Sequence, residues 1–236
     1  MRIWDINPGY LNRQSLLGEH RELHGIVSIL THGKKGYSRH PETMRWVDST
    51  WALRQRHQQL VAEMELRGYS DRSPVSVEFT DNVNRWPGLY IDEPYQQFII
   101  LKTKYTDKEP GRIPLPANAQ QVWSQHKYSL LARDVELYKK IGKEVSLMKP
   151  SQEFSQTALL LTEYLRRQPS LGGVRNALQH MWGHVSDSSI QTEISIETLS
   201  LRQLLEEIQK RVMEIREPYL LQSTALSELA VWLPKK

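Results

Sequence analysis

The sequence predicts a mainly α-helical fold with two helical domains. Apolar residues recur at three- and four-residue spacing along several long stretches, whereas candidates for extended strands are few and short. Between these stretches, the turn-rich segment Glu109–Asn118 holds three prolines and one glycine. We therefore expect a first domain at residues 1–112, a Pro-rich linker at 113–118 and a second helical domain at 119–236.

Two long helices are expected in the first domain. Asn12 can cap a helix that continues to about Leu30, because the apolar residues between them keep helical spacing. Pro41 suits the first turn of a second helix, which Gly68 would end. Residues 70–118 look irregular, with two short extended candidates, VSVEF and QFIIL. The first domain should thus combine helices with long irregular loops.

The second domain has the pattern of a helical bundle. Apolar residues recur at helical spacing, and prolines and glycines fall between the periodic stretches. The predicted helices cover roughly residues 119–147, 152–168, 172–185 and 198–215.

The composition excludes several classes of site. Because the chain has no cysteine, it has no disulfide, no thiolate metal site and no cysteine nucleophile. No apolar run approaches the roughly 18 residues that suggest a membrane span. The start, MRIWDINPGY, lacks the apolar stretch of a signal peptide, so a cytoplasmic location is expected. Any chemistry must come from amines, carboxylates, hydroxyls or imidazoles.

Basic residues gather in one part of the chain. Between His32 and Arg56 there are six Lys and Arg residues and two acidic ones, a surplus equal to the net charge of +4 of the whole chain. Such a surplus suits a polyanionic partner. Glycines in the loop between the first two helices would let four side chains approach phosphates, namely Lys34, Lys35, Arg39 and His40. His40 could instead cap the helix that follows it.

A weak local signal leads to a family resemblance. Arg21 and Glu22 are adjacent on the first predicted helix, and such neighbours usually form a solvated face. They lie, however, in an ungapped series that resembles the pyrimidine-dimer DNA glycosylase family: Arg2-Ile3, Gln14, Leu16, Glu19 and Arg21-Glu22-Leu23. The resemblance continues with Arg54, Arg56, Leu60, Ala62-Glu63 and Arg67-Gly68-Tyr69, and the loop GKKGYSRHP is similar to the bacterial branch. It covers residues 1–72 and, less closely, 73–112.

The resemblance implies an endonuclease V-like helical fold and a reaction that uses no metal or other cofactor. In the family the nucleophile is the backbone amine of the first residue of the mature chain, which maps onto Met1. A helical glutamate completes the site and maps onto Glu22, at the family's separation of 21 residues. Initiator methionine is generally removed only before a small residue, so Arg2 leads us to expect that Met1 stays.

The implied chemistry suits these two groups. An α-amine has a reference pKa of about 7.7 to 8.0, against about 10.4 for lysine, so part of it is a neutral nucleophile at physiological pH. By resemblance, the amine attacks the sugar carbon that bears the damaged base, displaces the base and forms an imine, and β-elimination then breaks the strand. Glu22 would stabilise the cationic sugar and move protons. The resemblance favours cyclobutane dimers as the lesion, and oxidised or alkylated bases stay open.

The resemblance also maps contacts with double-stranded damaged DNA onto this chain. The family residues that hold DNA around the lesion correspond to Arg2, Arg21 and, in the same block, Gln14. The segment TKYTDKEPGR resembles, with one gap, a family segment whose spaced cations correspond to Lys104, Lys108 and then Arg112. For the two lysines, a solvated basic edge is an equal alternative. Gly25 stands where the family has another DNA-holding arginine, which leaves the preferred substrate open.

The second domain resembles an uncharacterised bacterial domain family that also occurs appended to thiouracil desulfidases. The segments that carry the resemblance are QHKYSLLA, RNALQHMWGHV and REPYLLQS. A helical fold is implied, with no established activity. His180 and His184, with His126, have a spacing that could bind metal, but core or surface roles are favoured and no metal site is predicted. An internal network and a binding cleft are both open for Arg175, Tyr219 and Gln222.

Three functions are compatible with the sequence. The leading hypothesis is a DNA repair glycosylase with abasic-site lyase activity, associated with the bacterial nucleoid when bound to DNA. One alternative is a nucleic-acid-binding protein without catalysis. Another places the activity in the C-terminal domain, on modified bases or nucleosides. Trp46 and Trp51 are expected in the core rather than as wedges between bases.

Overall fold

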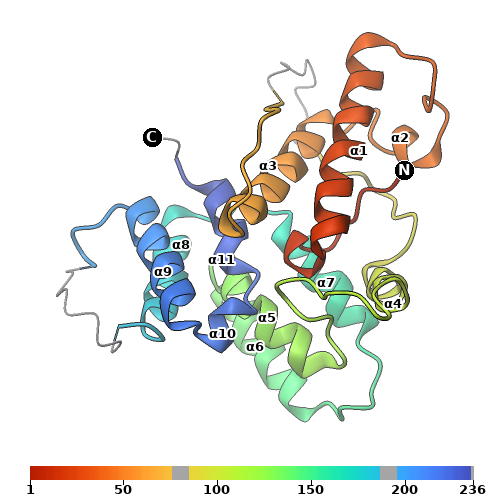
Figure 1. Cartoon of the computed structure of the whole chain (residues 1–236). Helices are drawn as coiled ribbons and strands as arrows, with labels where there is room; N and C mark the ends of the chain where they lie inside the picture. The colour runs from red at the N-terminus through yellow and green to blue at the C-terminus, as the bar shows by residue number, and fades with distance from the viewer. Residues whose placement is uncertain (76–84, 187–195, 235–236) are drawn as a thin grey trace. The chain divides into compact units, whose positions relative to one another are not determined.

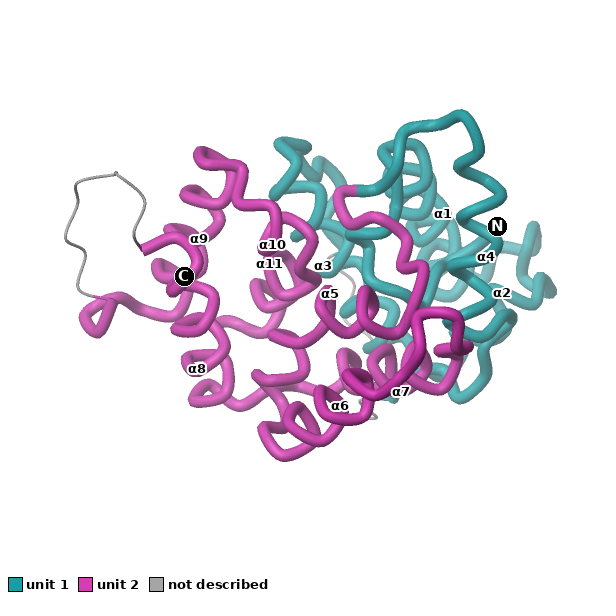
Figure 2. Tube along the Cα trace, turned by 90° about the horizontal axis from the view of Figure 1, so that it is seen from below, with its two compact units in different colours: residues 1–111 teal, residues 112–236 magenta. Residues whose placement is uncertain are grey.

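A computed structural model describes residues 1–75, 85–186 and 196–234. In these ranges every regular element is a helix, which confirms the mainly α-helical prediction. The chain divides into two compact units, residues 1–111 and 112–236 (Figure 2). Within the described ranges no helix combines the length and the apolar character needed to cross a membrane. The extended candidate VSVEF lies, apart from its first residue, outside the described residues.

The helices of unit 1 begin and end at residues with the expected capping chemistry. Those described are η1 (Pro8–Tyr10), α1 (Arg13–His32), α2 (Pro41–Met44), α3 (Thr50–Leu66) and α4 (Pro94–Lys104), and α1 packs along α3 (Figure 1). The Asn12 side chain accepts a hydrogen bond from Ser15 N at 2.9 Å and caps α1, as predicted. After α3, Gly68 has a φ of 78°, a left-handed conformation that suits glycine at a helix end.

The single helix predicted after the basic loop is two helices in the structure. The side chain of Arg45 turns back from the end of α2 and pairs with Asp5 at 3.0 Å and with Glu42 at 2.7 Å. Beyond this point the backbone forms i→i+3 hydrogen bonds, which are tighter than those of an α-helix. Tertiary contacts thus override the local helical pattern.

The segment QFIIL is helical in the structure, so the extended prediction was wrong. It lies in α4, which begins at Pro94. Gln97, Phe98 and Leu101 are buried, and their three- and four-residue spacing gives one buried helix face. A short apolar run fits a strand and a helix equally well, and packing decides between them.

The first eleven residues are mostly buried and, apart from η1, irregular. Ile3, Trp4 and Ile6 are each at most 4% exposed. Buried backbone carbonyls outside regular structure need donors from elsewhere. Three arginines supply these donors: Arg45 donates to Ile3 O at 3.2 Å, Arg56 to Ile6 O at 2.8 Å, and Arg67 to Leu11 O at 2.7 Å. We call them the carbonyl-binding arginines.

Each carbonyl-binding arginine is also paired with a buried carboxylate. Arg56 forms two hydrogen bonds with Glu19, at 2.7 and 3.0 Å, and both side chains are at most 2% exposed. Arg67 pairs with Glu63 at 2.7 Å. Because these carboxylates neutralise the guanidinium groups, the charged donors can remain in the core.

Unit 2 is a helical bundle around α5. Its described helices are α5 (Ala119–Leu131), α6 (Val135–Leu147), α7 (Ser155–Leu165), α8 (Leu171–Trp182), α9 (Leu201–Ile215), α10 (Pro218–Leu221), α11 (Ala225–Glu228) and η2 (Leu229–Trp232). The central helix α5 packs on α6, α7, α8 and α11. Three of the predicted helices correspond to α7, α8 and α9.

The helix predicted over residues 119–147 is interrupted between α5 and α6. Arg133 forms a bidentate pair with Glu228, at 3.0 Å to each carboxylate oxygen, and Asp134 caps α6 by accepting from Leu137 N. Helix α8 approaches this turn closely, because a Cβ atom at Gly173 would lie 2.1 Å from Ala132 O. The chain therefore turns here for tertiary reasons and requires glycine at position 173.

Removing the buried cation of the Arg56–Glu19 pair should destabilise unit 1 strongly. The variant Arg56→Ala leaves Glu19 buried and without its partner, so we expect it to lower the free energy of unfolding by about 3 to 5 kcal/mol. The matched control is Arg54→Ala, an exposed arginine on the same helix, with an expected change within about 0.5 kcal/mol. Urea unfolding followed by tryptophan fluorescence measures both. Equal effects of the two variants would contradict this account.

Unit 2 should lose stability in acid through His126. Burial lowers the pKa of this imidazole to about 4 although Nδ1 lies 2.8 Å from Val122 O. The unfolded state, with the ordinary value of 6.5, therefore binds more protons between these two values, and stability falls as the pH falls. By about pH 4.5 the loss from this residue should reach roughly 2 to 3 kcal/mol relative to pH 7.

The variant His126→Gln isolates this contribution from that of the other histidines. Its unfolding free energy, measured by urea titration across the same pH range, should decline less steeply than that of the wild type. The exposed control His180→Gln should keep the wild-type slope. Parallel curves for the wild type and His126→Gln would refute the assignment.

Candidate active site

The start of the chain contacts the first helix at Glu22. The backbone amide of Arg2 donates a short hydrogen bond to Glu22 Oε2. The amine of Met1 is three covalent bonds from that amide nitrogen, or about 3 Å. The amine therefore lies within roughly 6 Å of the Glu22 carboxylate. Met1 and Glu22 are both partly exposed, so a ligand can reach them.

Two cations lie near the ring of Trp4, two residues after Arg2. The guanidinium of Arg2 lies 4.3 Å from the centroid of the Trp4 ring, and Lys104 Nζ lies 5.9 Å from it. Arg2 also pairs with Asp92 at 2.6 Å. The structure thus brings together two of the residues that the sequence mapped onto DNA contacts, Arg2 and Lys104. Sequence reasoning missed Asp92, because no local pattern links it to a residue 90 positions earlier.

Three other mapped residues line one hollow of unit 1. Gln14, Arg21 and Lys108 share it with the polar residues Asn12, Arg13 and Glu109 and with Leu17. Arg21 and Lys108 are exposed, and the Arg21 side chain is held by its own helix through Leu17 O at 3.3 Å. Arg13 was not predicted, and its position one residue before Gln14 on α1 was the available signal.

The basic loop between α1 and α2 is exposed at Lys34, Lys35 and Arg39. His40 accepts a hydrogen bond from Glu42 N through Nδ1 at 3.1 Å, so the capping role that the sequence left open is present. The charge surplus of this region needs correction, however. Arg45 and Arg56 are buried in ion pairs, and their charges are not available to a polyanion.

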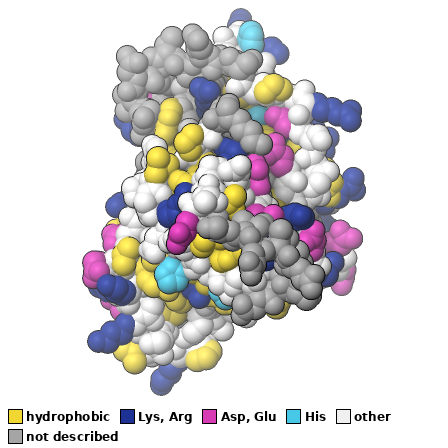
Figure 3. Space-filling model, turned by 90° about the vertical axis from the view of Figure 1, so that its left-hand side faces the viewer, with side chains coloured by type: hydrophobic (Ala, Val, Ile, Leu, Met, Phe, Trp, Pro, Cys, Tyr) yellow, Lys and Arg dark blue, Asp and Glu magenta, His cyan; other side chains and the backbone are white. Residues whose placement is uncertain are grey.

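Charges of both signs occur together on one face of the molecule. On the face drawn in Figure 3, Lys and Arg side chains alternate with Asp and Glu side chains, so that face is not a basic surface. Arg112 also departs from its mapped role. It lies in unit 2, and its guanidinium donates to Leu221 O at 2.6 Å and Ser223 O at 3.1 Å. This arginine stabilises the turn between α10 and α11.

Comparison with known families adds to this geometry. Residues 1–77 match the pyrimidine dimer DNA glycosylase family model. Residues 127–229 match a second family model, described as a protein of unknown function (DUF1722). Both resemblances drawn from the sequence are thereby confirmed. Searches of curated proteins and of solved structures gave no match.

The glycosylase-family segment, residues 1–77, holds most of the groups described above. It contains Met1, Arg2 and Glu22, and the match supports a glycosylase-like function for this segment.

The same segment also contains a group of side chains that sequence reasoning overlooked. His20, His24, His57 and Asp71 offer nitrogen and oxygen atoms that all lie within 4.8 Å of one another. The available signal was the four-residue spacing of the two histidines on α1.

The histidines of unit 2 do not form a comparable group in the described residues. His126 is buried and bonded to Val122 O, and His180 is exposed, as the favoured interpretation predicted. His184 instead joins an aromatic cluster: its Nε2 lies 2.6 Å from the Tyr128 hydroxyl, and its ring stacks on Tyr219 with a centroid distance of 5.1 Å. Lys127 Nζ lies 4.5 Å from the Tyr219 ring centroid, and burial lowers the pKa of this lysine.

The other polar residues that the sequence analysis singled out in unit 2 have different environments. Arg175 donates to Ile196 O at 3.2 Å and Leu199 O at 2.9 Å, a structural role. Tyr219 belongs to the aromatic cluster, and Gln222 is exposed.

Proposed function

We propose that this chain is a DNA repair glycosylase with abasic-site lyase activity, and that its nucleophile is the amine of Met1. The hydrogen bond between the Arg2 amide and Glu22 is the observation that supports this best, because it brings the carboxylate within roughly 6 Å of the amine. The family match of residues 1–77 supports damaged DNA as the substrate and pyrimidine dimers as the lesion.

The reaction follows from the electronic properties of the two groups. The lone pair of the neutral amine attacks C1′ of the damaged nucleotide, the bond between C1′ and the base breaks, and the base leaves with its electron pair and takes up a proton. Opening of the sugar ring gives an imine between C1′ and the Met1 nitrogen. Loss of a proton from C2′ then expels the 3′ phosphate, and water hydrolyses the imine. Glu22 stabilises the positive charge on the sugar and carries the protons.

The cations near this site suit a phosphate backbone on either side of the lesion. Arg2 and Lys104 lie by the Trp4 ring, three residues after Met1, while Arg21, Lys108 and Arg13 line the hollow on α1. Phosphate contacts of this kind position a duplex and carry no sequence information, which fits an enzyme that recognises damage. A damaged base must also leave the stack to reach the amine.

Borohydride trapping tests the nucleophile. The full chain, incubated with a duplex that contains a pyrimidine dimer or an abasic site, should become covalently attached to DNA when borohydride reduces the imine. A chain extended by two residues before Met1 should give no adduct, and the same extension placed after the last residue should leave trapping unchanged. Mass spectrometry of the purified protein checks that the amine is free.

Two outcomes would end this proposal. Strand cleavage that survives the amino-terminal extension would show that another group is the nucleophile. Tight binding to dimer-containing DNA without any adduct would favour the alternative of a binding protein without catalysis. Repeating the trap with oxidised and alkylated oligonucleotides identifies the lesion.

The carboxylate is tested by Glu22→Gln, which keeps an acceptor for the Arg2 amide but cannot transfer protons. We expect base release under single-turnover conditions to slow by roughly 10² to 10⁴-fold while DNA affinity changes little. The control is Glu65→Gln, an exposed glutamate on α3, which should behave as the wild type. A rate for Glu22→Gln within about twofold of the control would exclude this role.

The hollow on α1 is tested by the salt dependence of DNA binding. Arg21→Gln and Lys108→Gln should each reduce the slope of log affinity against log salt by about one, because one phosphate contact is lost. Lys139→Gln, which removes an exposed lysine on α6, should leave the slope unchanged. Equal slopes for all three variants would show that DNA does not contact this hollow.

A further inference from the structure

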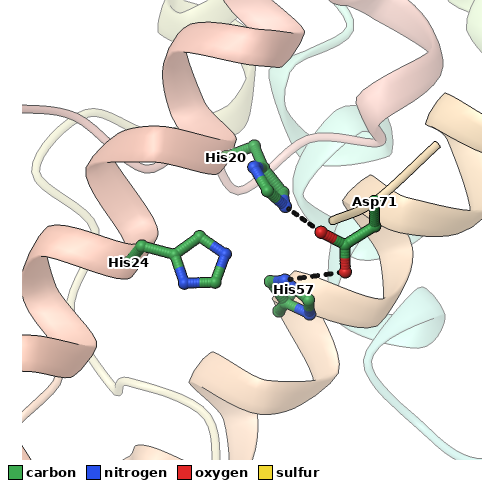
Figure 4. A group of neighbouring side chains, drawn as sticks. All are labelled: His20, His24, His57 and Asp71. Carbon is green, nitrogen blue, oxygen red and sulfur yellow. Dashed lines mark ion pairs between the residues drawn. The ribbon is translucent and has the colours of Figure 1, made fainter. Parts of the chain in front are cut away.

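Three imidazoles and one carboxylate converge at the interface of α1 and α3. Figure 4 shows His20 and His24 on one face of α1, His57 on α3 and Asp71 in the segment that follows α3. His20 Nε2 lies 3.3 Å from Asp71 Oδ1, and His57 Nε2 lies 3.7 Å from Asp71 Oδ2. The ring centroids of the histidines are 4.7 to 5.1 Å apart. We call these four residues the histidine cluster.

One nitrogen of each imidazole in this cluster, Nε2, lacks a hydrogen-bond partner. Nε2 of His20, of His24 and of His57 is buried without a protein hydrogen bond in each case. The side chain of His57 is 6% exposed and that of His20 is 11% exposed, so both are largely buried and the His57 ring is more than nine-tenths buried. A buried polar atom without a partner is costly, and native proteins rarely keep three of them together. These atoms therefore indicate a ligand that accepts lone pairs from nitrogen.

We propose that the histidine cluster binds one Zn²⁺ ion, with Nε2 of the three histidines and one carboxylate oxygen of Asp71 as ligands. Three imidazoles and a carboxylate match the nitrogen and oxygen preference of zinc, whereas Mg²⁺ and Ca²⁺ prefer sites made of oxygen alone. One ring nitrogen of each histidine and one oxygen of Asp71 already lie within 4.8 Å of one another. A tetrahedral site with bonds of about 2.0 to 2.1 Å needs separations of roughly 3.3 Å, which small side-chain rotations provide.

The surroundings of His57 and Asp71 suit metal binding. Burial, and then the neighbouring rings of His24 and His20, lower the pKa of His57 to about 4, so its imidazole is neutral. The Ser73 backbone hydrogen-bonds the His57 ring and favours its protonation, as a carbonyl acceptor does. Nε2 of His57 has no hydrogen-bond partner, so its lone pair is available to the ion. The Ser73 amide in turn donates to Asp71 Oδ1 at 2.8 Å.

The bound ion would have a structural role. With four protein ligands, a tetrahedral zinc has no open position for water or substrate. Residues on an α-helix are about 100° apart, so Glu22 lies roughly 200° around α1 from each of the two histidines. The ion thus joins α1 to α3 and to the segment after Gly68, on the side of α1 that faces away from Glu22. It fixes the helix that carries the proposed catalytic carboxylate without entering the reaction.

Metal titration of the full chain, purified without a histidine tag and stripped with a chelator, tests this proposal. ZnCl₂ should bind at one equivalent per chain and raise the unfolding temperature. CoCl₂ should give the intense visible bands of tetrahedral cobalt. His24→Gln and Asp71→Asn, at partly exposed positions, should weaken binding by more than about 100-fold, measured by competition with a chromophoric chelator.

The matched control is His32→Gln, which removes an exposed histidine from the same helix and should keep wild-type affinity. Circular dichroism checks that each variant remains helical. The proposal is wrong if the wild type gains no thermal stability from Zn²⁺, or if His24→Gln and Asp71→Asn bind zinc as the control does. Octahedral cobalt bands would also overturn it. None of these measurements depends on DNA, so they stand apart from the trapping experiment.

Discussion

The position of the amino terminus depends on guanidinium groups that bind backbone carbonyls. Residues 1–11 are mostly buried and, apart from η1, irregular, so their carbonyl oxygens need donors that a helix or sheet would normally supply. Arg45, Arg56 and Arg67 provide them. Each guanidinium then needs a buried carboxylate, which explains why unit 1 keeps acids such as Glu19 and Glu63 in its core. An end of the chain that would otherwise fray is thereby fixed.

The same arginines show why sequence predicted some features and missed others. Asn12, Pro41 and Gly68 act through their own neighbours in the chain, so helix starts and ends could be predicted. The end of α2 and the direction of the Arg45 side chain depend on Asp5, which is 40 residues earlier in the sequence. The count of basic and acidic residues in the sequence therefore treated Arg45, a buried cation, as a surface charge. Met1 and Glu22 could be paired only through a family resemblance, and Asp92 and Asp71 carry no local signal at all.

Helix α1 serves two purposes because its faces have different surroundings. His20 and His24 lie one turn apart against α3, where burial removes water from their nitrogens. Glu22 lies between them in sequence but on the other side, where it contacts the chain's second residue. A ligand that holds the histidine face in place would therefore also hold Glu22, and rotation of α1 would disturb both.

A nucleophile at a chain terminus must be positioned and still move during the reaction. Ile3 is fixed by burial and by Arg45, and the Arg2 amide is fixed by Glu22. Because the peptide bond is planar, only rotation about the Cα–C bond of Met1 then moves the amine relative to Glu22. The amine is confined to an arc beside the carboxylate, which reduces the entropy lost on attack. In the proposed reaction, this one free torsion would also let the nitrogen follow C1′ as the sugar ring opens.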